Sequence, residues 1–227
     1  METARHRHEY KYILSQAQIL MEDAKINTIA ELDSYVGEQG YYNIRSLYFD
    51  DYEKEETTTI MTRVVQDPLH PIINGENIYG NWIQLFYIHP LKRNCGISLQ
   101  QCEMLMAGRV PSDIKEDQQV LWKLAYLMET RLMMPKIIVD YDRIPYVYRP
   151  GDANVRITFD KNIKSINDTN SFLDLKVGGR GILPVGSALM EVKFDDFIPD
   201  EIYSLLQLNG LQVSTFSKYY LCRKFAR

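Results

Sequence analysis

The chain of 227 residues is 45% hydrophobic and 25% charged, a composition that supports a packed core and excludes a disordered or collagen-like chain. Its 26 Lys and Arg residues and 30 Asp and Glu residues give a formal net charge of -4, which argues against a protein whose whole surface binds nucleic acid or anionic lipid. Any site for anions must therefore be local.

Strands and one helix are expected in the first part of the chain. Residues 5–14 alternate between polar and larger side chains, and Ser15 is an N-cap before an amphipathic stretch, so a strand should lead into a helix. Residues 41–49 are rich in aromatic and β-branched side chains and predict a second strand. TTTIMTRVV at 57–65 and NWIQLFYIH at 81–89 predict two more, with a loop between them.

Helices are expected at three later places. Ser98 and Gln101 form a capping box at the start of a short helix. Residues 117–134 carry apolar side chains at helical spacing, and Pro135 should end this helix. Pro199 is expected at the first position of another helix.

Further strand-like runs are KIIVDY, YVYR, NVRITFDKNI and SALMEVKFDDF, with Pro145 separating the first two. A total of about eight strands without regular strand–helix alternation predicts a mostly antiparallel α+β fold. The chain shows no internal repeat and no linker, so residues 1–227 are expected to form a single domain.

The cysteines and the N-terminal residues bear on the cellular compartment in which the protein is expected. Cys95, Cys102 and Cys222 are an odd number without the spacing of a metal knuckle, so a reducing environment is the simpler expectation. The N-terminal residues are charged where a signal peptide needs an apolar segment, and no apolar run approaches the roughly 20 residues that cross a bilayer. We expect a cytoplasmic protein without direct membrane insertion, for which any coupling to a membrane needs a separate partner.

Three expected strands each carry a polar face opposite an apolar one, because residues two apart in a strand share a face. These polar faces comprise Arg5, Arg7, Glu9 and Lys11; Arg156, Thr158 and Asp160; and Glu191 and Lys193. They could be the solvent face of a one-sided sheet. They could also line a closed barrel whose lumen holds a polyphosphate with a divalent cation, since Arg and Lys bind phosphate oxygens and carboxylates bind the metal.

Six stretches together resemble one protein family in order and over both ends of the chain. They are RHEYKYIL at 7–14, IRSLYFDD at 44–51, RLMMPKIIVDYDR at 131–143, NVRITFDKNI at 154–163, LMEVKFDDFIPDEI at 189–202 and FSKYYLCRKF at 216–225. On these residues the sequence resembles the VTC domain of polyphosphate polymerases, within the triphosphate tunnel metalloenzyme superfamily that includes the CYTH proteins.

The resemblance implies a closed antiparallel β-barrel of about eight strands with flanking helices, enclosing a basic tunnel. It implies that ATP binds there with Mn²⁺ or Mg²⁺ and that its terminal phosphate moves onto inorganic polyphosphate. Such transfer needs positioning and charge compensation and no covalent enzyme nucleophile.

The resemblance also implies roles for particular residues. Catalytic, phosphate-neutralising roles fall on Lys11, Arg156, Lys193 and Lys218. Further phosphate contacts fall on Arg7, Arg45, Lys136 and Arg143. Metal ligation falls on Glu191, helped by Glu9.

The segment from Tyr52 to Cys95 departs from the family. A basic strand of the KYRIR kind and an LEKK strand are missing, and the interval from Thr57 to Asn94 offers Arg63, Lys92 and Arg93 as its basic residues. Missing partners for buried phosphate charge are costly. Divergence would leave an inactive or repurposed tunnel, whereas a pair of compensating frameshifts would scramble a bounded segment.

Three functions therefore compete. The leading one is an ATP-dependent polyphosphate polymerase, in an active or degenerate form. The second is a non-catalytic domain that binds polyphosphate or another polyanion, with no role for nucleic acid. The third is a metal-dependent tripolyphosphatase, in which water accepts the phosphate.

Overall fold

The computed structural model describes residues 8–34, 36, 38–51, 59–66, 83–88, 92–150, 154–207 and 211–225. The strands are β1 (His8–Leu14), β2 (Glu31–Leu32), β3 (Tyr42–Asp50), β4 (Thr59–Gln66), β5 (Ile83–Ile88), β6 (Lys92–Gly96), β7 (Met134–Tyr148), β8 (Val155–Ile166), β9 (Arg180–Gly181) and β10 (Ala188–Phe194). The helices are α1 (Gln16–Ile26), α2 (Leu99–Met106), α3 (Gln119–Arg131), α4 (Asp200–Gln207) and α5 (Lys218–Lys224).

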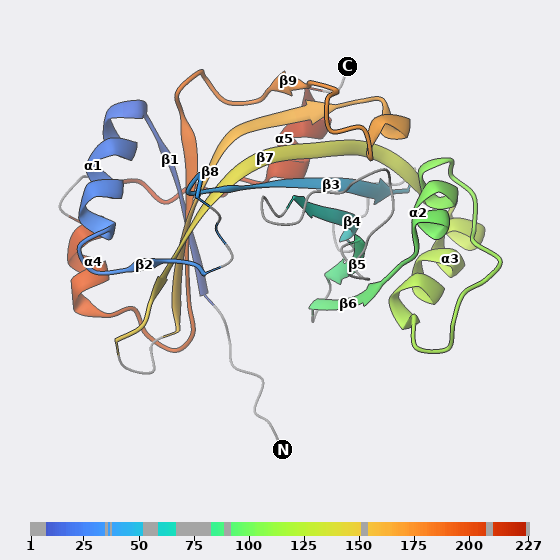
Figure 1. Ribbon diagram of the computed structural model, residues 1–227, viewed down its shortest axis with the longest axis horizontal. Helices are drawn as coiled ribbons and strands as arrows, with labels where there is room; N and C mark the ends of the chain where they lie inside the picture. The colour runs from blue at the N-terminus through green and yellow to red at the C-terminus, as the bar shows by residue number, and fades with distance from the viewer. Residues whose placement is uncertain are drawn as a thin grey trace.

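The strands form one antiparallel sheet in the order β1-β10-β8-β7-β3-β4-β5-β6, with β2 beside β7 and β9 beside β8. The long strands β7 and β8 bend along their length, so that the sheet curves like an arch (Figure 1). α1 and α4 lie at one end of the arch, and α2 and α3 lie at the other. The expected antiparallel α+β class is confirmed.

The expected closed barrel of eight strands is wrong, because the sheet has ten strands and remains open. Within the described ranges, β1 and β6 stand at opposite ends of the strand order and do not pair with each other. The free edge of β1 is occupied instead by the segment before α5, where the Ser214 N–H donates to the Lys11 carbonyl at 2.7 Å. This contact satisfies a backbone group that a closing strand would otherwise pair with.

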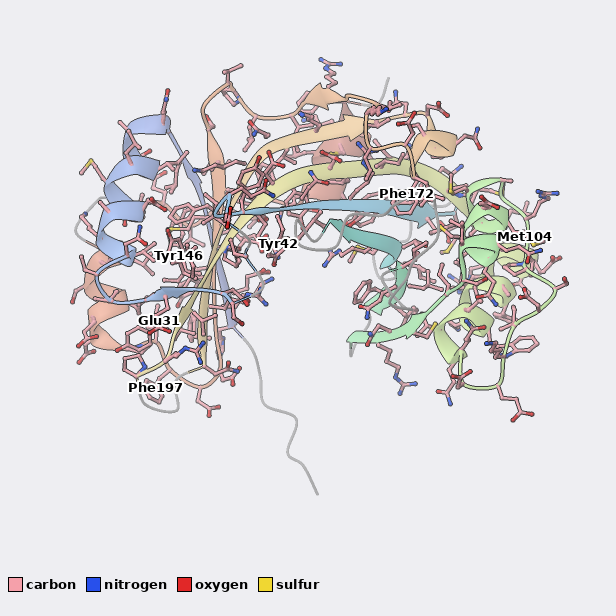
Figure 2. The ribbon with its side chains drawn as sticks, viewed as in Figure 1. Glu31, Tyr42, Met104, Tyr146, Phe172 and Phe197 are labelled. Atoms are coloured by element: carbon pink, nitrogen blue, oxygen red, sulfur yellow. The ribbon has the colours of Figure 1, made fainter. Side chains whose placement is uncertain are left out.

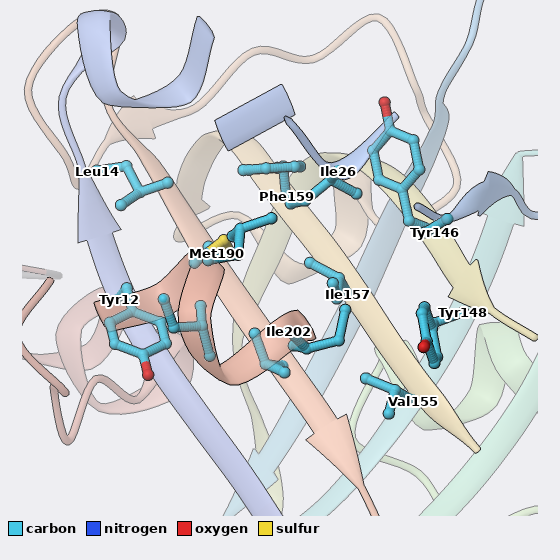
Figure 3. Close-up of a cluster of buried hydrophobic side chains, with 14 of the residues drawn as sticks. Tyr12, Leu14, Ile26, Tyr146, Tyr148, Val155, Ile157, Phe159, Met190 and Ile202 are labelled. Atoms are coloured by element: carbon cyan, nitrogen blue, oxygen red, sulfur yellow. The ribbon is translucent and has the colours of Figure 1, made fainter. Parts of the chain in front are cut away.

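Two apolar clusters pack on the outer face, at opposite ends of the sheet. In the first, side chains of β1, β10 and β8 meet Ile26 of α1 and Ile202 of α4 (Figure 3). In the second, α2 and α3 cover the other end, around Leu47 and Leu121. Tyr146 of the first cluster and Phe172 of the second mark this separation in Figure 2.

The opposite face, here called the inner face, is the one on which α5 packs. Phe216 and Cys222 join an apolar cluster with Tyr48, Val139 and other residues of β3, β4, β5 and β7. Tyr219 stacks on Tyr48 with ring centroids 4.8 Å apart. The C-terminal helix is thereby fixed against the middle of the sheet.

Local signals explain most of the element boundaries. The capping box of Ser98 and Gln101 is present at the start of α2, as expected. α3 ends at Arg131, earlier than expected, because Leu132 adopts a left-handed conformation with φ of 53° that stops the helix before the proline. β6 was not expected, because its sequence KRNCG lacks the β-branched and aromatic residues of a typical strand.

Pro145 does not divide the region into two strands, as the sequence predicted, and β7 runs without a break from Met134 to Tyr148. The Pro145 carbonyl accepts from the Asp33 N–H at 3.0 Å, on the side of β7 that faces β2. Since the N and the carbonyl of one strand residue point to the same side, the missing N–H of Pro145 faces away from β8 and breaks no ladder bond there.

Within the part of the chain that the structure describes, no helix has the length and apolar character needed to span a membrane.

Candidate functional site

Four neighbouring strands bring the polar faces expected from the sequence together on the inner face. In the register of β1, β10 and β8, Lys11 pairs with Glu191, which pairs with Thr158. One step along, Glu9 pairs with Lys193, which pairs with Arg156. The side chains in ion-pair contact here form what we call the charge cluster: Glu9, Lys11, Arg143, Asp160, Glu191, Lys193 and Lys218.

Glu191 is at the centre of the charge cluster and is 4% exposed. Its carboxylate lies 2.5 Å from Nζ of Lys218, 3.3 Å from Nζ of Lys193 and 3.4 Å from Nη2 of Arg143. Burial alone would raise the pKa of Glu191, but Lys218, Lys193 and Arg143 outweigh it and lower that pKa well below its usual range. Glu191 is therefore a buried carboxylate that is charged at neutral pH.

Asp160 is the site residue that the sequence interpretation missed, and it is fully buried. Arg143 donates two hydrogen bonds to it, from Nε and Nη2, both at 2.7 Å. Nζ of Lys218 lies 2.7 Å away. The signal was present in the alternation of Arg156, Thr158 and Asp160 along one strand face, which placed this carboxylate beside the expected site.

Lys218 is the first residue of α5 and reaches back into the sheet. Ser217 caps the helix by accepting from the Tyr220 N–H. Burial alone would lower the pKa of Lys218, but Asp160, Tyr141 and Glu191 raise it above its usual range, so the ammonium group stays charged. Nζ also lies 5.1 Å from the centre of the Tyr141 ring, a cation–π contact.

The rim of the charge cluster is more open. Glu9 accepts from Lys11 at 3.0 Å and from Lys193 at 2.9 Å. The side chains of Lys11 and Lys193 are 25% and 32% exposed. These two lysines are therefore the cations of the cluster that an incoming anion meets first.

Arg156 lies beside the charge cluster but turns away from it. Its Nη2 donates to Asp33 Oδ2 at 3.0 Å and to the Tyr42 hydroxyl at 3.3 Å. Its backbone pairs with Lys193 across β8 and β10. Arg156 thus shares the face and the neighbourhood of the cluster, with its guanidinium directed towards the segment after β2.

Two further predicted site residues, Arg45 and Lys136, are not brought to the charge cluster. Arg45 lies on the outer face of β3, buried against Asp140 at 2.6 Å and donating to the carbonyls of Asp174 and Val177. Lys136 lies at a β-bulge of β7 and makes no ion pair with the cluster in the described ranges. Arg7 falls outside the described residues.

The other half of the inner face is apolar where the family resemblance implies basic strands. Met61 and Phe86 of β4 and β5 are buried there beside Tyr48. Arg63 is a cation of this half; its Nε donates to Ser46 Oγ at 3.2 Å, and its guanidinium lies 5.2 Å from the centre of the Phe86 ring. Among the described residues, no carboxylate forms an ion pair with Arg63.

The part of the chain that the structure describes offers no metal site built from protein ligands alone. The described ranges contain no group of three or more His, Cys, Asp or Glu side chains arranged to hold an ion. Glu9 and Glu191 both contact Nζ of Lys193, so their carboxylates flank one position. Two carboxylates suit a hard divalent cation that takes its other ligands from water and phosphate.

Comparison with models of protein families shows the family to which this chain belongs. The sequence model of the VTC domain matches residues 88–226, more than half of the chain. The chain belongs to the VTC domain family. This confirms the resemblance inferred from the motifs. A search of curated proteins finds no match.

A solved structure supports the fold of this VTC domain protein. A candidate adenylate cyclase from Bacillus halodurans is similar with a TM-score of 0.50 and 12% identity, covering 92% of each chain. At this identity the likeness concerns the fold alone. An inorganic triphosphatase gives a lower TM-score of 0.34 at 12% identity, covering 95% of this chain and 90% of the other.

The VTC match begins at residue 88, near the end of the divergent segment, and leaves out the N-terminal motifs. The structure nevertheless places Glu9 and Lys11 of β1 directly beside Glu191 of the matched region. The two parts of the chain therefore contribute to one VTC-type face.

Proposed function

We propose that this VTC domain protein binds the triphosphate of ATP and inorganic polyphosphate on its inner face and transfers the terminal phosphate of ATP to the polyphosphate chain. The observation that supports the proposal is the convergence of Lys11, Lys193, Lys218 and Arg143 on one face of adjacent strands. Family membership supplies the reaction to be tested.

The residues of the charge cluster have the chemistry that phosphoryl transfer needs, which is positioning and compensation of charge. Lys11 and Lys193 on the rim would bind phosphate oxygens as point charges, and Arg143 would offer a forked pair of donors. Each cation is paired with a carboxylate in the unliganded protein. Phosphate oxygens would therefore have to replace carboxylate oxygens, which makes binding an exchange of ion pairs.

Glu9 and Glu191 fit a divalent ion, Mn²⁺ or Mg²⁺, and would hold it between them in place of the Lys193 ammonium. Such an ion supplies compensation of phosphate charge that the lysines alone cannot. Lys193 would then be available to bind phosphate oxygens of the substrate. The single domain over residues 1–227, the cytoplasmic location and the separate membrane partner belong to the same proposal.

A second candidate function is favoured by the apolar half of the inner face. Phe86 and Met61 occupy the place where cations would compensate the rest of a triphosphate. A domain of this kind could retain polyphosphate at the charge cluster without turning ATP over. The experiment must therefore distinguish polyphosphate binding without phosphate transfer from polyphosphate synthesis.

Incubation of the purified protein with ATP and Mn²⁺ tests the proposal, with polyphosphate and released orthophosphate measured in parallel. Long polymer is the expected product. Orthophosphate without polymer would show a hydrolase, and neither product despite measured polyphosphate binding would show the non-catalytic function. Glu191→Gln should abolish metal-dependent turnover, whereas Glu103→Gln on the exposed surface of α2 is the matched control.

A further inference from the structure

Thr158 lies at the middle of the charge cluster without belonging to any of its ion pairs. It is on the inner face of β8, between Arg156 and Asp160, and is 2% exposed. Its neighbours across the two adjacent strands are Glu191 on β10 and Pro145 on β7. A neutral hydroxyl is thus enclosed by the most highly charged part of the molecule.

The hydroxyl of Thr158 has no hydrogen-bond partner among the described residues. Nearly all buried polar groups in proteins have one, so an unpartnered group needs an explanation. Nε of Arg156, two residues earlier on the same strand face, is also buried and without a partner. Of the two, Thr158 is the one that the charge cluster encloses, because the Arg156 guanidinium is directed towards Asp33 and Tyr42.

The residues paired with Thr158 across the sheet use their acceptors elsewhere. The Glu191 carboxylate is engaged by Lys218, Lys193 and Arg143. The Pro145 carbonyl accepts from the Asp33 N–H, on the side of β7 that faces β2. An acceptor from outside the chain would therefore give the Thr158 hydroxyl its partner.

We propose that Thr158 Oγ1 donates a hydrogen bond to a phosphate oxygen of the bound polyphosphate. This inference rests on the proposed function, because it needs an anion at the charge cluster. Phosphate oxygens are strong acceptors that carry no hydrogen, so they match the unused hydroxyl. The Lys193 and Arg156 side chains, 32% and 37% exposed, are the groups free enough to move and admit the ligand.

Thr62 is a second threonine with an unpartnered hydroxyl, but it lies in different surroundings. Its hydroxyl is also buried without a partner among the described residues. It pairs with Leu47 and Leu85 on the outer face, inside an apolar cluster. Thr62 therefore faces an apolar cluster instead of the charge cluster, which makes it the matched control.

The test measures the binding of inorganic tripolyphosphate by calorimetry and the melting temperature for the wild type, Thr158→Val and Thr62→Val. Both valine variants keep the β-branched shape and remove an unpartnered hydroxyl, so both should melt at or above the wild-type temperature. Thr158→Val should bind tripolyphosphate about tenfold more weakly, the effect of losing a hydrogen bond to a charged group. Thr62→Val should bind as the wild type does.

Each outcome has a distinct meaning. Equal affinity of Thr158→Val and the wild type would overturn this inference and leave the proposed function standing. A wild type that does not bind tripolyphosphate would overturn the proposed function itself. If Thr158→Val fails to fold, Thr158→Ser and Thr158→Ala replace it, because only the alanine variant lacks the hydroxyl; equal affinity of these two would again overturn the inference.

Discussion

Lys218 of α5 forms an ion pair with Glu191 of β10, with 2.5 Å between Nζ and Oε1. α5 has seven residues, too few to be stable as an isolated helix. Tertiary contacts therefore hold it in place, and this ion pair is one of its polar attachments to the sheet, beside those of Tyr219 and Arg223 to Asp50. The same contact supplies a deeply buried cation of the charge cluster, so the position of α5 and the charge of the site are coupled.

Replacement of Lys218 by methionine should destabilise the fold strongly. The change leaves Glu191 and Asp160 buried without their shared ammonium group, and breaking a buried pair costs about 3–5 kcal/mol. Urea denaturation at neutral pH measures the loss in the free energy of unfolding. Lys224→Met, at the exposed end of α5, is the control and should change it by less than about 0.5 kcal/mol. Similar stability of the two variants would show that the buried pair contributes little.

The stability contributed by Glu191 should disappear in acid. Burial opposes its charge, but Lys218, Lys193 and Arg143 lower its pKa in the folded state below the ordinary 4.5. The unfolded chain therefore binds the proton first, and the stabilisation, complete above pH 4.5, declines as the pH falls below that value. The free energy of unfolding of the wild type should exceed that of Glu191→Gln at pH 7, and the difference should shrink at pH 4 and below. A difference independent of pH would contradict this account, and Glu103→Gln should show none.

Strand alternation predicted which side chains of β1 and of β10 share a face. The pairs Glu9 with Lys11 and Glu191 with Lys193 lie on one face, and the observed register joins them across β1 and β10. The prediction of Lys218 as a site residue required the family resemblance, because the sequence of a helix does not show against which part of a sheet the helix packs. The missed residue Asp160 alternates with Arg156 and could have been included by the same reasoning.

Arg45 shows what the sequence could have excluded. It alternates with Leu47 and Phe49, which are buried in the outer apolar cluster, so its face was readable from its neighbours. The open sheet could not be predicted in this way. Closure depends on whether two edges meet, and here the Ser214 backbone already occupies part of the edge of β1.

β4 and β5 lie within the divergent segment and still fit the sheet. Ile60 and Leu85 pack into the outer cluster, while Met61 and Phe86 pack into the inner one. In both strands, successive side chains therefore point to the outer and the inner face in turn, even though the strands lack the basic residues of the family. The loss of cations in this half of the inner face is accommodated by the fold.

Arg45 and Lys193 should respond in opposite ways to substitution. Arg45→Met breaks a buried pair with Asp140 and should cost about 3–5 kcal/mol of stability, with no change in tripolyphosphate affinity while the protein is folded. Lys193→Gln, on the rim, should change stability by about 1 kcal/mol or less. It should weaken tripolyphosphate binding about tenfold, as expected for a lost contact to a charged group. Denaturation and calorimetry on both variants check this, and weaker binding by Arg45→Met would return Arg45 to the binding site.

Glu9 should act as an internal competitor of the phosphate chain. Its carboxylate contacts both rim lysines, at 3.0 Å and 2.9 Å, so an anion must displace it to reach Lys11 and Lys193. Without divalent metal, Glu9→Gln should therefore bind tripolyphosphate more tightly, by about two- to fivefold for a partly exposed ion pair. With Mn²⁺ the gain should vanish or reverse, because the same carboxylate is then a metal ligand. Calorimetric titration with and without EDTA separates the two conditions. A gain of the same size in both would remove Glu9 from the metal site, and weaker binding in both would show that Glu9 positions the lysines instead of competing for them.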